Sequence, residues 1–322
     1  GGGSPSVAAA TQALVRQLRA AGAPQYPLAL LAAFRARFPQ FAEQEQGHYS
    51  QQDADECLKQ LLAALAPVPA APGSGYSSAV EQLFCGELST QVRCVEAPEE
   101  TAEGVERFSA LQCNIGKETT HLLAALQDSM RQSLTKHSST LGRDAVFEKA
   151  LAVARLPYCL PVQFVRFYYN AKKKLNAKIV RPVEFAFRLD LYALCTPSLQ
   201  AALDGPRAAL ERLELARAQD ASAAPAATTE EAPLENRCGL YDLVAVVSHQ
   251  GRSVDSGHYV AWVREESDGE KWLKFDDDKV SPCTKDDVKK LSGKGGADWH
   301  MAYILIYRSV DVSAAERFAA SS

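Results

Sequence analysis

The stretch SGHYVAWVREESDGEKWLKFDDDKV, residues 256–280, decides the fold because it consists of two extended runs joined by a polar turn. A turn over residues 266–270, centred on Ser267, predicts an antiparallel hairpin with three directly opposed pairs: Trp262 with Trp272, Val260 with Lys274, and His258 with Asp276. Directly opposed residues share one face of a hairpin, with Cβ atoms about 4.5–5.5 Å apart. We therefore expect strand pairing alone to bring the His258 imidazole and the Asp276 carboxylate together.

This His–Asp pair has two interpretations. Across a hairpin, such a pair commonly forms a simple surface hydrogen bond. A carboxylate that accepts the imidazole N–H also fixes the tautomer and stabilises the imidazolium, as the acid of a catalytic triad does. The small, glycine-bearing segment HQGRSVDSG before His258 suits approach by another backbone, and three consecutive aspartates repel unless one has a partner. Both features favour the catalytic interpretation.

A histidine base of this kind serves a cysteine or a serine nucleophile. The chain has eight cysteines and no Gly-x-Ser-x-Gly motif, which favours cysteine. No two cysteines form a Cys-x-x-Cys pair, so we expect no zinc site, no other metal and no cofactor. Cysteines scattered through apolar runs are typical of free thiols in a reducing compartment, and we expect localisation in the cytoplasm and also the nucleus.

The composition is that of an ordinary globular protein. The 322 residues are 47% hydrophobic and 23% charged, with a net charge of −4, and we expect no nucleic-acid partner. The sequence has no apolar run of about 18 residues, so we expect no membrane association through a transmembrane helix. Arg16 and Arg19 interrupt the N-terminal apolar pattern, which argues against a signal peptide, and the glycine-rich start is expected to be a flexible lead-in.

Helical patterns come first and strand patterns follow. The first 66 residues predict amphipathic helices, one of which has Asp53 as its expected N-cap and Glu56 three residues later. From Val80 the pattern changes to strands, with a helix expected over residues 122–134. A further helix is expected in SLQAALDGPRAALERLELARAQ, followed by the disordered, low-complexity segment DASAAPAATTEEAPLEN. This order predicts the α+β class rather than alternating β–α–β units.

Several motifs, in order, resemble the ubiquitin-specific cysteine proteases. SGHYVAWV, KWLKFDDDKV and AYILIY resemble the histidine box of that family, QQDADE resembles its second box, and LPYCLPVQFVRF resembles its central strand motif. The resemblance runs from about residue 27 to 307 and is strongest to the proteasome-associated members. It implies one papain-like catalytic domain over residues 1–322, with a helical thumb (1–66), β-rich fingers and palm (80–322), and a partly disordered insert at 199–237.

The same resemblance implies an activity and its residues. The activity is hydrolysis of the (iso)peptide bond after the C-terminal glycine of ubiquitin, with His258 as general base and Asp276 as its orienter. The implied partners are ubiquitin, ubiquitin chains and the 26S proteasome, the last through a domain absent from this sequence. The residues implied to bind the ubiquitin tail are Gln51, Asp53, His249, Ser253, Ser256, Gly257, Tyr259 and Tyr303. Four of these residues have simpler explanations. Gln51 and Asp53 could merely begin a helix, and Tyr259 and Tyr303 could be ordinary strand aromatics.

One feature departs from the family pattern. The family nucleophile lies in a Gly-Asn-Thr-Cys segment, and residues 1–322 contain no such segment. We expect the sequence to start inside the thumb, to lack the cysteine-bearing helix, and to be inactive by itself. Cys57 is expected to be a core thiol, and the uncovered thumb surface is expected to be apolar. The alternative function is a non-catalytic ubiquitin-binding or proteasome-regulatory module.

Overall fold

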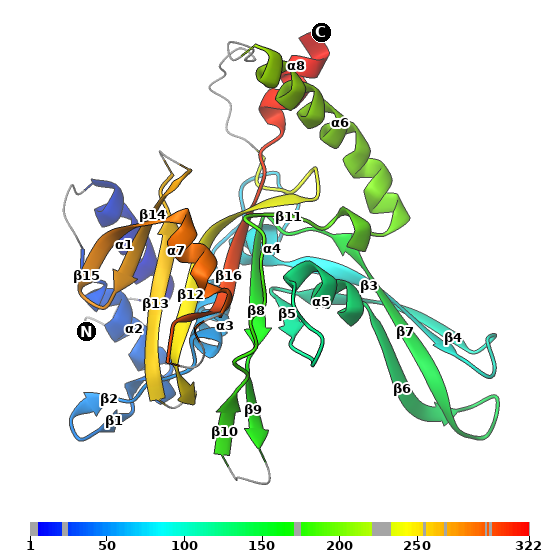
Figure 1. The fold of residues 1–322 in the computed structure, drawn as a ribbon, viewed down its shortest axis with the longest axis horizontal. Coiled ribbons are helices and arrows are strands. Elements are labelled where there is room, and N and C mark those ends of the chain that lie inside the picture. The colour runs from blue at the N-terminus through cyan, green and yellow to red at the C-terminus, as the bar shows by residue number, and fades with distance from the viewer. Residues whose placement is uncertain are drawn as a thin grey trace.

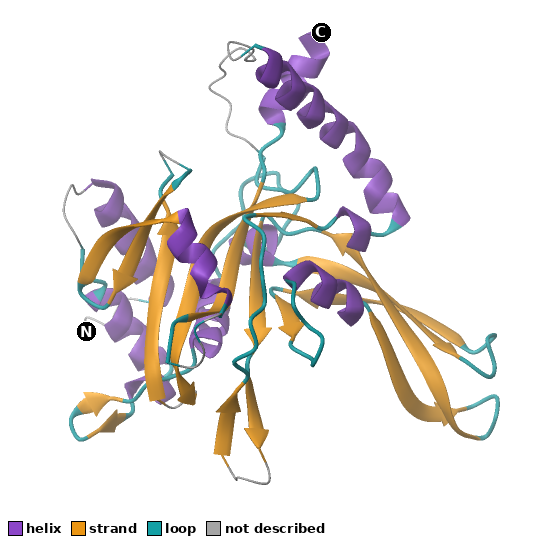
Figure 2. Ribbon diagram, viewed as in Figure 1, coloured by secondary structure: helices purple, strands orange, loops and turns teal. Residues whose placement is uncertain are grey.

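The computed structural model of the chain has a helical thumb, a central palm sheet and a projecting fingers sheet, with a pair of helices at one end (Figure 1). Figure 2 shows that helices gather at the thumb and at this end, whereas strands form the palm and fingers. The described residues are 6–20, 25–170, 175–220, 233–253, 256–266, 269–293, 295 and 298–321. Within them, no helix is long and apolar enough to span a membrane. The arrangement is the α+β architecture expected from the sequence.

The palm is an eight-stranded, mostly antiparallel sheet in which strand order differs from chain order. Across the sheet, the strands are β15 (Lys279–Thr284), β14 (Lys271–Asp276), β13 (Ser256–Arg264), β12 (Leu240–Ser253), β16 (Met301–Ser309), β8 (Cys159–Val165) and β5 (Leu111–Asn114). β11 (Arg188–Asp190) also pairs with β12, and β5 runs parallel to β8. β16 and the middle of β12, residues 243–247, read as nearly continuous apolar runs, as is typical of strands covered on both faces.

The main core lies against this sheet and is rich in aromatic side chains. Trp272, Tyr241 and Tyr307 are fully buried. The Tyr241 hydroxyl donates to the Pro157 carbonyl at 2.6 Å, and the Tyr307 hydroxyl donates to the Ala186 carbonyl at 2.7 Å. Buried tyrosine hydroxyls need such partners, so these two bonds fix the loops that connect the strands.

The register of the β13–β14 hairpin differs from the sequence-based prediction. The observed pairs are Ala261 with Phe275, Trp262 with Lys274, Val263 with Leu273, and Arg264 with Trp272. The predicted pairs, in which Trp262, Val260 and His258 faced Trp272, Lys274 and Asp276, are wrong by two residues, because the turn is centred one residue later. The assumed centre, Ser267, lies outside the described residues. A shift of two residues preserves the faces of the sheet, whereas a shift of one reverses them.

The fingers are a four-stranded antiparallel sheet that projects from the palm (Figure 1). Its strands, in spatial order, are β4 (Thr101–Phe108), β3 (Gly86–Cys94), β7 (Arg143–Arg155) and β6 (Arg131–Ser138). Cys94, Ala97, Ala145 and Phe147 form the buried cluster of this sheet.

Two helix boundaries near the fingers were not predicted. The helix expected over 122–134 ends earlier, as α5 (Leu122–Ser129), and the following residues form β6. Leu134 lies opposite Phe147 in the β6–β7 ladder, so its apolar contact comes from the fingers rather than from a helix stripe. The strand pattern expected from Val80 also begins later, because α4 (Ala79–Phe84) precedes β3 and is capped by the Ser78 side chain.

The thumb contains α1 (Val7–Ala20), α2 (Leu28–Arg37), the short helix η1 (Pro39–Ala42) and α3 (Ala54–Leu65). Phe34 packs with Phe38 and Phe41 at centroid distances of 4.9 and 5.0 Å. The predicted cap of α3 is confirmed, because the Asp53 carboxylate accepts the backbone N–H of Asp55 at 2.7 Å. A small hairpin, β1 (Gln44–Glu45) and β2 (His48–Tyr49), lies between η1 and α3.

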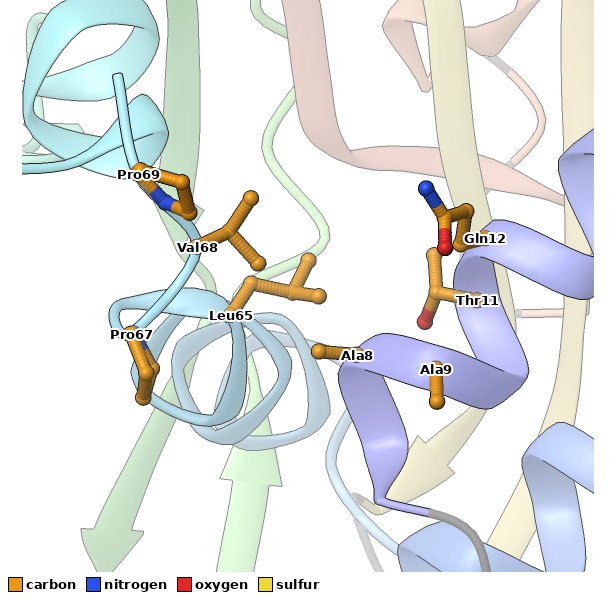
Figure 3. Close-up of a pocket in the computed structure, with 8 residues that line it drawn as sticks. All are labelled: Ala8, Ala9, Thr11, Gln12, Leu65, Pro67, Val68 and Pro69. Atoms are coloured by element: carbon orange, nitrogen blue, oxygen red, sulfur yellow. The ribbon is translucent and has the colours of Figure 1, made fainter.

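The thumb exposes apolar surface, as expected from the sequence. Leu18 and Leu28 are 54% and 70% exposed. In a pocket of about 510 Å³, the first turns of α1 face the segment that follows α3 (Figure 3). Its lining residues are Ala8, Ala9, Thr11, Gln12, Leu65, Pro67, Val68 and Pro69.

The helix expected within the 199–237 insert is present as α6 (Pro197–Gln219) and packs on α8 (Ser313–Ser321). The two helices share a cluster that includes Leu213 and Ala315, away from the main core. They project from the end of the palm (Figure 1). Residues 221–232, which carry most of the predicted disordered stretch, lie outside the described residues. The remaining elements are the short helices η2 (Tyr192–Leu194), α7 (Lys285–Lys289) and η3 (Lys290–Ser292) and the hairpin of β9 (Phe167–Asn170) and β10 (Leu175–Lys178).

Trp272→Ala is expected to lower the free energy of unfolding by about 3–5 kcal/mol, because it removes a buried aromatic ring from the core. This ring packs edge-on against Phe187 with 5.8 Å between centroids. The matched control is Trp299→Ala, whose indole is 65% exposed and whose removal is expected to cost less than about 0.5 kcal/mol. Urea denaturation followed by circular dichroism measures both, and equal losses would contradict the assignment of Trp272 to the stabilising core.

Candidate active site

The site begins at the end of the β13–β14 hairpin, where a histidine and an aspartate form a short hydrogen bond. His258 Nε2 lies 2.6 Å from Asp276 Oδ1, and the two side chains are 36% and 31% exposed. They are diagonal rather than direct neighbours in the ladder, since the register places Asp276 two residues from the position opposite His258. Diagonal neighbours on one face lie within reach of long side chains. The predicted contact is therefore confirmed although its predicted register is wrong, and its catalytic role stays a prediction.

The Asp276 carboxylate is shared between two donors. Its Oδ2 accepts a hydrogen bond from Lys274 Nζ at 2.7 Å, while Oδ1 contacts His258. The hydrogen bond from Lys274, followed by the one from His258, lowers the pKa of Asp276 to about 2. The carboxylate is thus charged at neutral pH and can orient and stabilise a protonated imidazole.

A metal interpretation of this corner is disfavoured by its geometry. His258, Asp276 and Asp277 offer nitrogen and oxygen atoms within 4.8 Å of one another. Two ligands of one zinc ion at about 2.0 Å in tetrahedral geometry lie roughly 3.3 Å apart. The separation of 2.6 Å between His258 and Asp276 is instead that of a hydrogen bond. We therefore assign these atoms to the His–Asp pair.

A second set of residues, the aromatic cluster, lies on the other face of the palm sheet. It consists of Phe167, His249, Tyr259 and Tyr303. His249 lies 4.7 Å from Tyr259 and 5.2 Å from Phe167, and Tyr303 lies 5.4 Å from Phe167, all between ring centroids. Phe167 begins β9 (Phe167–Asn170), which pairs with β10 (Leu175–Lys178) in a hairpin beyond β8. The cluster thus joins three segments that are far apart in the sequence.

The thumb contacts this aromatic cluster through the two predicted residues that precede α3. The Tyr303 hydroxyl donates to the Asp53 carboxylate, with 2.8 Å to each oxygen. Gln51 Nε2 lies 3.5 Å from His249 Nε2. Asp53 therefore caps a thumb helix and binds a palm tyrosine at the same time, which fixes the thumb against the palm.

The structure brings most of the predicted tail-binding residues together. Gln51, Asp53, His249, Tyr259 and Tyr303 form one connected set of contacts. His249 and Tyr303 are only 0% and 2% exposed, so they form the packed base of the thumb–palm junction rather than an open surface. The side chains of Ser253 and Ser256, also predicted to bind the tail, lie outside the described residues. The binding roles of all these residues stay predictions.

Gly257 holds the backbone close to His249. Its φ of +149° is uncommon for other residues, and a Cβ placed there would lie 2.2 Å from the Gln250 carbonyl oxygen and 2.5 Å from His249 Nε2. The start of β13 can therefore approach β12 only with glycine at this position. Because His258 is the next residue, this close approach also fixes the backbone position from which the His258 side chain extends.

Sequence reasoning missed two groups beside the site, the buried Lys178 and the partly buried His300. Lys178 Nζ donates to the His249 carbonyl at 2.7 Å and lies 3.1 Å from His249 Nδ1. Burial lowers the pKa of Lys178 to about 8, and burial together with Lys178 lowers the pKa of His249 to about 4. His300 lies 6.0 Å from His258 between ring centroids. Neither residue was part of a motif that the sequence analysis singled out.

The cysteines have the environment of structural thiols. Burial raises the pKa of Cys57, Cys85, Cys113, Cys159, Cys195, Cys238 and Cys283. The eighth, Cys94, is fully buried in the fingers cluster. Nucleophilic cysteines need the opposite, a lowered pKa beside a cation or a histidine. Cys57 packs against the thumb cluster, as expected for a core thiol.

Comparison with known proteins identifies a family model and several relatives. The model described as "Ubiquitin carboxyl-terminal hydrolase" matches residues 3–307. The chain is 38% identical over 308 residues to ubiquitin carboxyl-terminal hydrolase 6 of Arabidopsis thaliana, covering 87% of this chain and 63% of that protein. It is 34% identical over 312 residues to ubiquitin carboxyl-terminal hydrolase 14 of Caenorhabditis elegans, covering 91% and 61%. The chain therefore spans less than two-thirds of the length of these relatives.

A solved structure has the same fold. A chain of the SAGA Ubp8/Sgf11/Sus1/Sgf73 DUB module bound to ubiquitin aldehyde superposes with a TM-score of 0.61. The match covers 89% of this chain and 54% of that chain at 20% sequence identity. A likeness at this identity concerns the fold, and it confirms the finger–palm–thumb architecture.

The free energy of unfolding is expected to fall as the pH falls from about 6.5 to about 4, because His249 resists protonation in the folded state. An unfolded histidine binds its proton near pH 6.5, so within this window the unfolded chain holds more protons than the folded chain. The loss attributable to His249 is expected to reach about 1–3 kcal/mol. Urea denaturation between pH 7.5 and 4 measures the slope.

His249→Gln is expected to flatten this pH dependence, whereas the matched control His48→Gln, in the exposed β2 strand, is expected to leave it unchanged. An unaltered slope in the His249 variant would show that the acid sensitivity arises elsewhere.

Gly257→Ala is expected to destabilise the protein by about 1–3 kcal/mol and to displace His258 from Asp276, because the added methyl group collides with backbone and ring atoms. The control is Gly269→Ala, at a position where an added Cβ meets nothing within 4 Å. Denaturation and the His258 ring resonances in NMR spectra report the two effects. Wild-type stability and resonances in the Gly257 variant would contradict the close-packing argument.

Proposed function

Because the chain belongs to the ubiquitin carboxyl-terminal hydrolase family, we propose that it forms the base-bearing part of a thiol-dependent deubiquitinase. The reaction is hydrolysis of the (iso)peptide bond after the C-terminal glycine of ubiquitin. The single observation that carries the proposal is the contact between His258 Nε2 and Asp276 Oδ1 at 2.6 Å. The alternative is a non-catalytic module that binds ubiquitin or regulates the proteasome.

In this proposal, His258 moves the protons of the reaction. Asp276 accepts the Nε2–H of the ring, which leaves Nδ1 as the atom that takes the proton from a cysteine thiol. The thiolate attacks the carbonyl carbon of the terminal glycine, and the leaving amine receives the proton from Nδ1 as the C–N bond breaks. Water then hydrolyses the thioester with His258 again as base, which restores the thiol and releases the ubiquitin carboxylate. Asp276 stays charged throughout, in keeping with its lowered pKa of about 2.

We assign the thumb–palm junction to the tail of ubiquitin. Gln51 and Asp53 approach this junction from the thumb, and His249, Tyr259 and Tyr303 approach it from the palm. A Gly-Gly tail has no side chains, so a narrow passage beside packed aromatic rings admits it and excludes bulkier peptides. The ubiquitin aldehyde bound to the structurally similar DUB module supports ubiquitin as the ligand.

We place the nucleophilic cysteine outside residues 1–322. This placement is supported by the raised pKa of seven cysteines and by the burial of Cys94. It follows that residues 1–322 bind ubiquitin but do not hydrolyse its conjugates without that cysteine. We further propose ubiquitin chains and the 26S proteasome as partners, and the cytoplasm and nucleus as locations, on the resemblance of the motifs.

The direct test mixes residues 1–322 with ubiquitin and with ubiquitin that lacks its last two glycines. We expect intact ubiquitin to bind, and loss of the tail to weaken binding by roughly tenfold or more, because the tail supplies the contacts at the junction. Isothermal titration calorimetry measures both affinities. Equal affinities for the two ligands would contradict the assignment of the tail to this junction.

A ubiquitin that carries a C-terminal propargylamide separates the catalytic function from the alternative. We expect the natural protein to form a covalent adduct through a cysteine beyond residues 1–322, and His258→Ala in that protein to reduce turnover by about 10³-fold or more with little change in affinity. An adduct mapped to any of the eight cysteines here would overturn the placement of the nucleophile. Binding without any adduct in the natural protein would establish the non-catalytic module.

A further inference from the structure

Resting on the proposed function, we propose that Lys274 is a positioning residue for the His258–Asp276 pair. It acts by holding the second carboxylate oxygen of Asp276 and by placing a positive charge beside the imidazole. Lys274 makes no contact with the reacting atoms, so it acts through Asp276 rather than as a catalytic residue.

The first support is the geometry of β14. Lys274 and Asp276 are two residues apart on one strand, so their side chains leave the same face of the sheet. Lys274 Nζ lies 2.7 Å from Asp276 Oδ2, and Asp276 Oδ1 lies 2.6 Å from His258 Nε2. Each carboxylate oxygen therefore has its own donor, and rotation of the carboxylate would break both bonds.

Asp276 needs such a hold because of where it lies. It is the last residue of β14 and is 31% exposed, and Asp277, which follows, has a left-handed φ of 54°. The residue is diagonal to His258 rather than directly opposite it, so ladder geometry alone does not fix the carboxylate. An exposed aspartate at a strand end would otherwise have several rotamers open to it.

Lys274 is itself held by a chain of contacts that returns to His258. Its Nζ lies 5.6 Å from the centroid of the Trp262 ring, within the range of a cation–π contact. Trp262 Nε1 donates to Ser248 Oγ at 2.8 Å, and Ser248 Oγ lies 3.2 Å from His300 Nδ1. His300 in turn lies 6.0 Å from His258 between ring centroids. The ammonium group therefore has a defined position rather than that of a freely moving surface lysine.

The two groups carry opposite charges beside the imidazole. The ammonium group of Lys274 offsets part of the charge of the Asp276 carboxylate. The titratable and charged groups that face His258 are Lys274 and Asp276 of β14, Asp277 of the next turn and His300 before β16, while His249 of β12 lies nearby on the other face of the sheet. Burial and Lys274 lower the pKa of His300, so His300 is neutral at pH 7 and leaves Lys274 and the two aspartates as the charges beside the ring.

The test compares Lys274→Met with Asp276→Asn in residues 1–322, using NMR to follow the His258 Nε2–H proton in its hydrogen bond to Asp276. Lys274→Met is expected to move this proton to higher field and to broaden its signal, because the second oxygen of the carboxylate is no longer held. Asp276→Asn is expected to produce a larger shift in the same direction, because it removes the charged acceptor itself. A lysine without a positioning role predicts an unaltered signal in Lys274→Met.

Lys274→Arg is the matched control, since it keeps a charged donor, and its proton signal is expected to stay close to that of the unaltered protein. An unaltered signal in Lys274→Met would overturn the inference.

In the natural enzyme, Lys274→Met is further expected to lower kcat by about three- to tenfold with little change in KM, because substrate binding does not involve this residue. The two proposals fail separately. An absence of ubiquitin hydrolysis with the predicted changes in the His258 proton signal would refute only the proposed function. Hydrolysis with an unaltered signal in Lys274→Met would refute only the role of Lys274.

Discussion

The pairing of β13 with β12 on one side and with β14 on the other determines where the functional groups of this protein lie. Pairing with β12 sets His249 opposite Tyr259 and so builds the aromatic cluster on one face. Pairing with β14 sets Lys274 opposite Trp262, and with it Asp276 next to His258, on the other face. Because alternate residues of a strand point to opposite faces, one hairpin supplies two chemically different surfaces.

Polar contacts from Asp53 and Gln51 join the thumb to this sheet. Asp53 accepts both a backbone N–H of its own helix and the hydroxyl of Tyr303. Burial, and then Asp53, raises the pKa of Tyr303, so its hydroxyl keeps the proton that it donates. A helix boundary in the thumb and an aromatic ring in the palm therefore depend on the same carboxylate. Motion of the thumb away from the palm at this point must break this bond.

Sequence reasoning found the features that depend on local pattern and missed those that depend on distant packing. The strand alternation around His258 identified the right face, since an error of two residues in the turn leaves parity unchanged. The early end of α5 was missed because Leu134 packs on Phe147 across the fingers ladder, a contact that no local window contains. Lys178 was missed because only the fold reveals that the β9–β10 hairpin turns this lysine onto His249. The predicted contacts of Gln51 and Asp53 came from the family resemblance rather than from their spacing.

The fingers illustrate how a protein can vary without losing its chemistry. Their sheet has a separate apolar cluster around Phe147, and the His258–Asp276 pair lies in another sheet. A sheet with its own core can be lengthened, shortened or changed in surface charge by mutations whose effects stay within that sheet. Sequence change in this arm is therefore free of the constraints that the His258–Asp276 pair places on the palm. In a fold of this kind, the fingers can diverge while the palm keeps its geometry.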